Sequence, residues 1–382
     1  MTTAPSQASG RRVLVGMSGG VDSSVAAWLL KEQGWEVIGV TMKLWPQDCM
    51  SRAEDKCCGP QAIADARGVA HALGIPHYVV DEAVPFERLV IDYFTDEYRA
   101  GRTPNPCIMC NERVKFGNLR DKAAALGAEF IATGHYATVE HHEGTPPVLR
   151  KGIDSRKDQS YFLFSLNASQ LSRSLFPLGT LTKPEIRDIA RKLGLKVADK
   201  EDSQEICFVP GKDYKAFLKG RFEERGESFQ PGGFYDLHGN RLGDHDGIEF
   251  FTIGQRKGLP GGSPIPLYVV DIDPVKGRVI LGTEEDLLCT EFTAGRVTWH
   301  IPPPAEPLRI TVKIRHGHAA EPAEITVDTD GDAVIRPLEP IRAVTPGQAA
   351  VFYDGNRVLG GGWISRRTLA ALKYRRTEAV TA

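Results

Sequence analysis

Gly16-Met17-Ser18-Gly19-Gly20-Val21-Asp22-Ser23-Ser24 is the stretch that decides the fold of this 382-residue chain. It follows a β-branched apolar run over 12–17, and residues 21–33 after it have the apolar spacing of a helix. Two adjacent glycines let backbone N–H groups approach an anion closely, and the following helix adds the positive end of its dipole. The stretch therefore predicts a phosphate-binding turn between a buried strand and a helix.

Asp22 is unexpected in such a turn, because a carboxylate repels a phosphate unless a divalent cation bridges them. We therefore expect Mg²⁺ at Asp22. The pattern lacks the lysine of GxxxxGK[ST], so it is a different motif. An ordinary glycine turn capped by Asp and Ser would explain a Gly-Gly pair, but not a strand, SGGxDS and a helix together. The turn resembles that of the ATP pyrophosphatase superfamily, whose members adenylate an oxygen and release pyrophosphate.

The composition limits the partners and the compartment. Lys and Arg number 47 against 49 Asp and Glu, a net charge of −2, so a nucleic acid must be met by a local basic patch. No run of 18 apolar residues and no signal-like start occur, so we expect neither a membrane span nor export. Seven cysteines are an odd number, which favours a reducing cytoplasmic setting over a disulfide scaffold.

The order of predicted elements indicates an α/β fold with two further domains. Over 11–211, strand-like runs alternate with helical segments, which predicts a parallel sheet. Beyond this part, short runs such as 248–252 are separated by Gly and Pro, and from 291 they recur at a spacing typical of an antiparallel barrel or sandwich. We expect a catalytic domain at 1–211, a small central domain at 212–284 and a C-terminal β-barrel at 285–382. The helices expected in the first domain are 21–33, 60–73, 86–99, 112–126, 168–174 and 183–193.

Cys110 lies in the segment TPNPCIMCNE at 103–112. The two prolines favour an extended approach, and we expect a helix to begin near Asn111, whose dipole would lower the pKa of the Cys110 thiol. The surroundings are basic, with six basic and two acidic residues between 99 and 122, so they suit a thiolate or phosphates. The basic residues are Arg99, Arg102, Arg113, Lys115, Arg120 and Lys122.

Cys207 lies between Ile206 and Phe208, 97 residues after Cys110, so only the fold can bring the two together. Taken alone, Cys207 is better explained as a small buried hydrophobic residue, the commoner role of a free Cys between Ile and Phe. The other cysteines are interpreted as structural, because none completes a standard zinc spacing. They are Cys49, Cys57, Cys58 and Cys289.

Six motifs occur in an order that resembles the bacterial tRNA-specific 2-thiouridylase family. They are SGGVDSS at 18–24, TPNP with a following CN at 103–111, ATGHYA at 132–137, KDQSYFL at 157–163, ICF at 206–208 and GQRKGL at 254–259. The resemblance implies the three domains expected above. It implies that ATP adenylates the C2 oxygen of the wobble uridine of tRNA, with the lysine, glutamate and glutamine acceptors as substrates. Sulfur would come from a sulfur-relay protein or a cysteine desulfurase.

The resemblance also implies roles for individual residues. Cys207 would carry the persulfide, and Cys110 would attack it or assist release, leaving a Cys110–Cys207 disulfide for reduction. The residues implied for ATP are Gly16, Met17, Ser18, Gly19, Gly20, Val21, Asp22, Ser23, Met42 and Gly134. The residues implied for the target base are Asn105, Pro106 and Cys107, and those implied for tRNA are His135, Lys157, Asp158, Gln159, Arg315, His316 and Gln348.

Cys107 departs from the family pattern, which usually has an acidic residue at this position. Cys107 and Cys110 form a CxxC pair here, and Cys207 adds a third thiol. Related tRNA-thiolating enzymes hold a 4Fe–4S cluster on a CxxC and a third Cys. One hypothesis is therefore a 4Fe–4S cluster at Cys107, Cys110 and Cys207, in place of the persulfide route or alongside it.

Two other classes of function stay open from the residues. The first is an amidotransferase-like synthetase that uses the same loop on a small molecule, which leaves both cysteines and the barrel without a role. The second is a sulfur carrier or RNA-binding module with a vestigial loop. Ordinary structural roles are also open for His135, for the turn at 157–159, and for Arg315 with His316.

Overall fold

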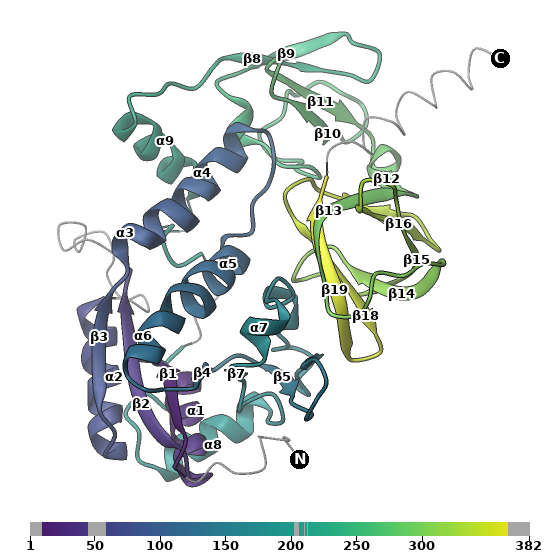
Figure 1. Ribbon diagram of the computed structural model, residues 1–382. Coiled ribbons are helices and arrows are strands. Elements are labelled where there is room, and N and C mark those ends of the chain that lie inside the picture. Colours follow the sequence, from purple (N-terminus) through teal and green to yellow (C-terminus); the bar gives the residue numbers. More distant parts are fainter. Residues whose placement is uncertain (1–9, 45–58, 202–205, 210, 212, 366–382) are drawn as a thin grey trace. The chain divides into compact units, whose positions relative to one another are not determined.

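The computed structural model describes residues 10–44, 59–201, 206–209, 211 and 213–365 (Figure 1). By its contacts the chain forms two compact units. Unit 1 consists of Met1–Ile91, Pro106–Lys212 and Asn356–Val358, and unit 2 of Asp92–Asn105, Asp213–Gly355 and Leu359–Ala382. Within the described ranges, no helix is both long enough and apolar enough to cross a membrane. The expected domain boundaries at 211 and 284 stay a prediction.

Unit 1 contains the predicted parallel sheet, with strand order β3-β2-β1-β4-β7. Its register places Val15 of β1 opposite Gly39 of β2 and Ala132 of β4. The chain runs from β1 outward to β3 and then returns to β4 on the other side of β1, so the order reverses between β1 and β4. Ligands of open α/β sheets bind at the carboxyl ends of the strands at such a reversal. The strands are β1 (Arg12–Gly16), β2 (Glu36–Lys43), β3 (His77–Asp81), β4 (Phe130–Ala132) and β7 (Ser174–Leu175).

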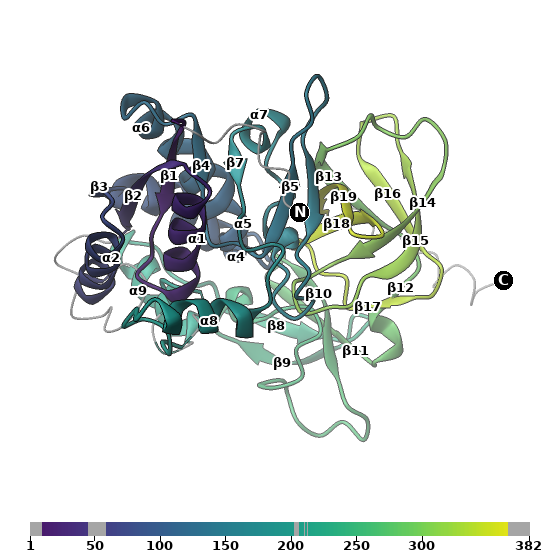
Figure 2. The same ribbon diagram turned by 90° about the horizontal axis from the view of Figure 1, so that it is seen from below.

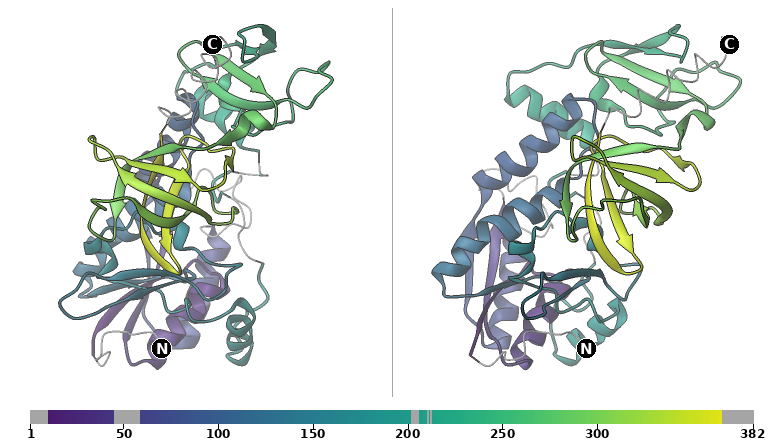
Figure 3. Two further views of the ribbon diagram at one scale, coloured as in Figure 1. Left: turned by 90° about the vertical axis from the view of Figure 1, so that its right-hand side faces the viewer. Right: turned by 45° about the vertical axis from the view of Figure 1, so that its right-hand side comes forward.

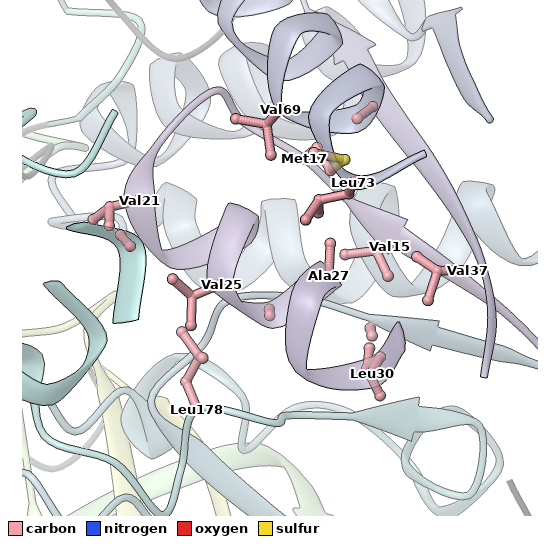
Figure 4. Close-up of a cluster of buried hydrophobic side chains, with 14 of the residues drawn as sticks. Val15, Met17, Val21, Val25, Ala27, Leu30, Val37, Val69, Leu73 and Leu178 are labelled. Carbon is pink, nitrogen blue, oxygen red and sulfur yellow. The ribbon is translucent and has the colours of Figure 1, made fainter. Parts of the chain in front are cut away.

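The core of this domain lies between the sheet and its helices. The side chains of Val15, Val25 and Leu30 meet in one apolar cluster (Figure 4), because the middle of β1 is buried and α1 turns its small and branched residues toward it. Figure 2 shows α1 next to β1 and also next to α8, with which it packs. The helices of this layer are α1 (Val21–Glu32), α2 (Pro60–Leu73) and α8 (Lys183–Lys192). These helices agree closely with the predicted ranges.

Two other predicted helices begin earlier than expected. The helix expected from 112 begins at Pro106, because proline suits the first turn, where its missing N–H is not needed. The helix expected from 86 begins at Ala83. Each contains a π-helical segment. The first consists of α5 (Pro106–Met109), η3 (Cys110–Asn118) and α6 (Leu119–Ala125), and the second of α3 (Ala83–Phe86), η2 (Glu87–Ile91) and α4 (Asp92–Arg99).

Several local predictions were wrong or incomplete. The helix expected over 168–174 ends at Leu171, and Ser174 belongs to β7, because that segment completes the parallel sheet beside β4. The strand expected over 248–252 is a 3₁₀ turn over Ile248–Phe250. The shortened helix is α7 (Ala168–Leu171). Elements that the prediction omitted are α9 (Tyr214–Glu224), β5 (Ala137–Glu140), β6 (Val148–Lys151), β9 (Arg241–His245) and the turn η4 (Ser160–Phe162).

Unit 2 contains a closed antiparallel barrel. Of the two architectures predicted from the sequence, a barrel or a sandwich, the barrel is therefore confirmed. Its order is β13-β16-β15-β14-β18-β19, and β13 also pairs with β19. Figure 3 shows the green-to-yellow strands closing around a common interior, where Phe292, Ile335 and Phe352 are buried. The strands are β13 (Phe292–Trp299), β14 (Leu308–Lys313), β15 (Glu321–Val327), β16 (Ala333–Pro337), β18 (Ala349–Asp354) and β19 (Arg357–Ile364), next to the short pair β12 (Leu288–Cys289) and β17 (Ile341–Arg342).

A smaller sheet in unit 2 has the order β10-β11-β8-β9. In the same unit α4 packs along α9, where the rings of Tyr98 and Tyr214 stack with centroids 5.1 Å apart. Arg221 of α9 and Arg225, directly after this helix, both contact the Asp92 carboxylate. The strands are β8 (Gly232–Tyr235), β10 (Tyr268–Asp273) and β11 (Arg278–Gly282), with a turn η7 (Glu285–Leu287) after them.

Candidate active site

The glycine turn lies at the reversal point of the parallel sheet, directly after β1. The hydroxyl of Ser23 accepts a hydrogen bond from the Ser18 N–H at 3.1 Å and lies 3.2 Å from the Gly20 carbonyl, so the turn folds back on the first turn of α1. Gly19 has φ +69°, and a Cβ there would lie 2.3 Å from the Ala62 carbonyl oxygen. No side chain caps α1 at Gly20 in the described structure. Backbone N–H groups are therefore left to face an anion.

Asp22 is held by two side chains from other parts of unit 1. The ammonium of Lys183 lies 2.7 Å and 2.9 Å from its two carboxylate oxygens, and the Tyr136 hydroxyl donates to Oδ1 at 2.6 Å. A single carboxylate fits a Mg²⁺ ion that takes its other ligands from substrate phosphates and water. Among the described residues, no group of three His, Cys, Asp or Glu side chains could hold a metal ion by itself.

Gly134 brings the end of β4 against this turn. A Cβ at Gly134 would lie 2.8 Å from the carbonyl carbon of Asp22 and 2.8 Å from the nitrogen of Ser23. Met42, at the end of β2, lies on the other side of β1, where the Met17 N–H donates to the Val40 carbonyl at 2.7 Å. The loops that follow β1 and β4 therefore meet at the carboxyl edge of the sheet, where ligands of open α/β sheets bind.

His135 is buried directly after Gly134. Its Nδ1 lies 2.6 Å from the Thr133 hydroxyl, and its ring packs beside both Phe116 and Phe176, with centroids 6.3 and 6.0 Å away. Burial, with the nearby charge of Lys115 second, lowers the pKa of His135 well below its ordinary value. The imidazole is therefore neutral at physiological pH.

The segment 157–159 is built into the loop beside His135. Asp158 is buried and accepts hydrogen bonds from the N–H groups of Gly152 and Ser160, both at 3.1 Å. The Gln159 side-chain oxygen accepts from the Tyr136 N–H at 3.0 Å, and the Gln159 backbone N–H donates to the Tyr136 carbonyl at 2.8 Å. Lys157 is half-buried at the turn that precedes them. These contacts fix the backbone of Tyr136, whose hydroxyl reaches Asp22.

The chain that leads to Cys207 is fastened to the glycine turn. The Lys200 ammonium donates to the Gly19 carbonyl at 3.1 Å and to Asp65 at 2.8 Å. Arg187 of α8 donates to the carbonyls of Ala198 and Lys200, both at 3.1 Å. Cys207 itself is half-buried, and residues 202–205 are not described. The segment with Cys207 thus begins at a fixed point on the phosphate turn.

Cys110 and Cys207 lie on segments that approach the same helix. The Phe208 ring packs edge-to-face on Phe86 of α3 at 5.9 Å, and α3 packs against η3, which begins at Cys110. Cys110 is buried and Cys107 is exposed. Because the helix begins at Pro106, the expectation that Cys110 occupies a helix N-terminus was wrong, and Cys107 occupies the first turn instead. Among the described residues, Cys107, Cys110 and Cys207 form no group that could hold a metal ion, so the 4Fe–4S cluster stays a hypothesis without support from the structure.

The expected basic patch around Cys110 is largely neutralised. Five of its six cations form ion pairs, and Lys115 donates to Asn111 at 3.0 Å. Lys122, for example, lies 3.3 Å from the buried carboxylate of Glu82. The other pairs are Arg99 with Glu227 and Glu249, Arg102 with Glu97, Arg113 with Glu112, and Arg120 with Asp121. The local excess of charge in the sequence is therefore not a patch of unpaired cations.

The remaining predicted residues belong to unit 2. The Gln348 amide donates to the carbonyls of Thr103 and Pro104, at 3.0 and 3.2 Å, directly before Asn105. Arg315 and His316 lie in the turn that follows β14.

Cys289 is buried in the barrel, where burial raises the pKa of its thiol to about 11, consistent with a structural role. Cys49, Cys57 and Cys58 lie outside the described residues.

Three side chains at the turn were missed by sequence reasoning. Tyr136, Lys183 and Lys200 contact Asp22 or Gly19, but they lie 114 to 181 positions away along the chain. Tyr136 lies within the ATGHYA motif, so that motif could have pointed to it as a site residue. Lys183 and Lys200 carry no motif of their own, and only the packing of α8 against α1 reveals them.

The geometry is that of an α/β domain with a glycine turn suited to an anion, followed by domains built mainly of β-strands. Residues 11–211 match the family described as tRNA methyl transferase HUP domain, 215–283 the tRNA methyl transferase PRC-barrel domain, and 289–364 the aminomethyltransferase beta-barrel domain.

Curated relatives specify the family. The chain is 51% identical to tRNA-specific 2-thiouridylase MnmA 1 of Caldanaerobacter subterraneus subsp. tengcongensis, over 93% of this chain and 98% of that protein. It is also 51% identical to tRNA-specific 2-thiouridylase MnmA of Geobacter metallireducens, over 93% of this chain and 96% of that protein. The chain belongs to the tRNA-specific 2-thiouridylase family. The words "methyl transferase" in the domain descriptions are not repeated in the names of these relatives.

Solved structures add little. A 4-thiouridine synthetase in complex with RNA and ATP is 16% identical, covers 56% of this chain and 51% of that chain, and has a TM-score of 0.35. A likeness at this level carries no argument about function.

We predict that Gly134→Ala weakens ATP binding about tenfold or more, because the added Cβ would push the backbone between Asp22 and Ser23 out of place. Isothermal titration of ATP against the folded variant measures this. Gly68→Ala is the matched control, because Gly68 lies within α2 and its Cβ would meet nothing within 4 Å. Equal ATP affinity in Gly134→Ala and the wild type would contradict the contact.

We predict that His135 makes the protein less stable in mild acid. Its pKa is lower in the folded than in the unfolded state, so only the unfolded state takes up the proton as the pH falls through about 6.5. The free energy of unfolding therefore falls with pH, by at most about 1.4 kcal/mol per pH unit for one proton. Urea unfolding between pH 7.5 and 5.5 should show a smaller fall for His135→Gln than for the wild type. An unchanged fall in His135→Gln, equal to that of the exposed control His71→Gln, would contradict this.

Proposed function

We propose that this protein is an ATP-dependent tRNA thiolating enzyme that replaces the C2 oxygen of the wobble uridine, position 34, with sulfur. The observation that carries the proposal is the 51% identity to 2-thiouridylases over 93% of the chain. The substrates are the tRNAs for lysine, glutamate and glutamine. A cysteine desulfurase or a sulfur-relay protein supplies the sulfur, and the reaction takes place in the cytoplasm.

The first step activates an inert carbonyl. ATP binds on the turn from Gly16 to Ser23, with Met42 and Gly134 on either side. Asp22 would hold a Mg²⁺ ion together with the phosphates, and the ion would supply positive charge for the leaving pyrophosphate. The C2 oxygen forms a bond to the α-phosphorus, the bond from that phosphorus to the β-phosphate oxygen breaks, and pyrophosphate leaves. The uridine, taken out of the anticodon stack, then carries AMP on C2 as a leaving group.

The second step transfers sulfur. The terminal sulfur of a persulfide on Cys207 attacks C2, and the C2–O bond breaks with release of AMP. The Cys110 thiolate then attacks the Sγ of Cys207, so the S–S bond to the transferred sulfur breaks and the electron pair stays on 2-thiouridine. The two electrons come from the enzyme's cysteines, which end as a Cys110–Cys207 disulfide. An external dithiol reduces this disulfide before the next turnover.

His135 and the segment Lys157–Gln159 are proposed tRNA contacts. They lie on loops that are joined where the Gln159 side chain accepts from the Tyr136 N–H, next to His135. Gln348 suits a positioning role, because it holds the backbone before Asn105, Pro106 and Cys107, the residues proposed for the base. Arg315 and His316, in a turn of the barrel, are proposed tRNA contacts.

The proposal is tested by incubating tRNA with ATP, a sulfur donor and the protein, followed by mass spectrometry of the nucleosides. The proposed enzyme yields 2-thiouridine at position 34 and releases pyrophosphate only when tRNA is present. Pyrophosphate release without RNA would instead indicate a synthetase acting on a small molecule. A carrier or binding module would release none.

We predict that Cys207→Ser and Cys110→Ser each reduce 2-thiouridine formation to background, because each removes a sulfur that must exchange a bond. Both variants should keep tRNA-dependent pyrophosphate release within about threefold of the wild type, since adenylation precedes sulfur transfer. Cys289→Ser is the matched control: its Sγ donates to the Glu291 carbonyl at 3.1 Å, a bond that a serine can keep, and thiolation should continue. Normal thiolation by Cys207→Ser would contradict the persulfide role.

A further inference from the structure

The phosphate turn contains no cation of its own. Residues 16–24 include one charged side chain, the carboxylate of Asp22, and no Lys or Arg. The leaving pyrophosphate of ATP is strongly anionic, so a turn with a net negative side chain needs positive charge from elsewhere in the fold. The Lys183 ammonium supplies such a charge, because it lies 2.7 Å and 2.9 Å from the two carboxylate oxygens of Asp22.

The position of Lys183 is unfavourable for a lysine that serves only stability. It is the first residue of α8, where the positive end of the helix dipole repels a cation. Only 8% of the residue is exposed, although lysine is rarely buried. A partly buried Lys–Asp pair also gains little net stability, because desolvation offsets the attraction. These three costs indicate a role other than folding.

The backbone around Lys183 is built to aim it. Its own N–H donates to Asp154 at 3.0 Å, and the Glu185 carboxylate accepts from the N–H and the hydroxyl of Thr182, both at 2.7 Å. The ammonium lies 5.8 Å from the centre of the Tyr136 ring, whose hydroxyl also reaches Asp22. Three segments, the turn, the loop after β4 and the start of α8, thus converge on one carboxylate.

We propose that Lys183 is a pyrophosphate-binding residue of the ATP site. Without ligand its ammonium neutralises Asp22; when a divalent cation takes the Asp22 carboxylate, the ammonium binds the phosphate oxygens. The inference rests on the proposed function only in taking ATP as the ligand of the turn. Lys183 thereby supplies from α8 the charge that other phosphate loops carry in their own sequence.

The first test is equilibrium binding, by isothermal titration, of Mg-ATP, Mg-pyrophosphate and AMP. Lys183→Met should weaken the binding of ATP and of pyrophosphate about ten- to hundredfold, which is the size of a charge-assisted contact. The affinity for AMP should stay within about twofold of the wild type. Lys183→Arg, which keeps the charge, should recover part of the loss. Lys192→Met is the matched control, since Lys192 is exposed at the other end of α8, and it should bind all three ligands like the wild type.

The second test separates a phosphate ligand from a mere partner of Asp22. In metal-free buffer, Asp22→Asn releases the ammonium, so pyrophosphate should bind this variant about tenfold more tightly than the wild type. The double variant Asp22→Asn/Lys183→Met should lose that gain. The double variant removes both charges of the pair together, so it leaves no unpaired buried charge and serves where Lys183→Met alone fails to fold.

Two results would overturn the inference: pyrophosphate bound by the double variant as tightly as by Asp22→Asn, or by folded Lys183→Met as tightly as by the wild type. Wild-type protein that binds neither ATP nor pyrophosphate would instead overturn the proposed function. The outcomes of the two proposals are therefore distinguishable.

Discussion

The site depends on the close approach of Gly134 to the backbone between Asp22 and Ser23. The register of β1 and β4, with Val15 opposite Ala132, forces the loops after these strands together at the reversal point of the sheet. Only a residue without Cβ fits there, since a Cβ would lie 2.8 Å from two backbone atoms. The same approach puts Tyr136 within reach of Asp22. One steric constraint thus positions the phosphate turn and the loop that carries His135.

Helix α8 contacts both the glycine turn and the segment that leads to Cys207. Its first residue, Lys183, holds Asp22, and Arg187, one turn later, holds the carbonyls of Ala198 and Lys200. Lys200, which lies seven positions before Cys207 in the chain, in turn contacts the Gly19 carbonyl. In the proposed reaction, this arrangement couples the segment that delivers sulfur to the turn that holds the nucleotide.

Local pattern predicted the elements whose structure depends on local physics. The apolar run before Gly16, the helix over 60–73 and the barrel strands followed from periodicity, and the glycine turn followed from its motif. Contacts between distant segments could not be predicted this way. The short run at Ser174 became a strand because β4 offered an edge, and Lys122, one of the cations near Cys110, pairs with the distant carboxylate of Glu82. Lys183 carried no local signal, since its partner lies 161 residues away.

The central claim is that the nucleotide held at this turn is attached to the C2 oxygen of the uridine before sulfur arrives. The most direct measurement uses tRNA with ¹⁸O at C2 of the wobble uridine, incubated with ATP, a sulfur donor and the protein. The account predicts that the released AMP is two mass units heavier and that pyrophosphate carries no label. Unlabelled AMP formed together with 2-thiouridine would contradict it, because the oxygen would then have left by another route.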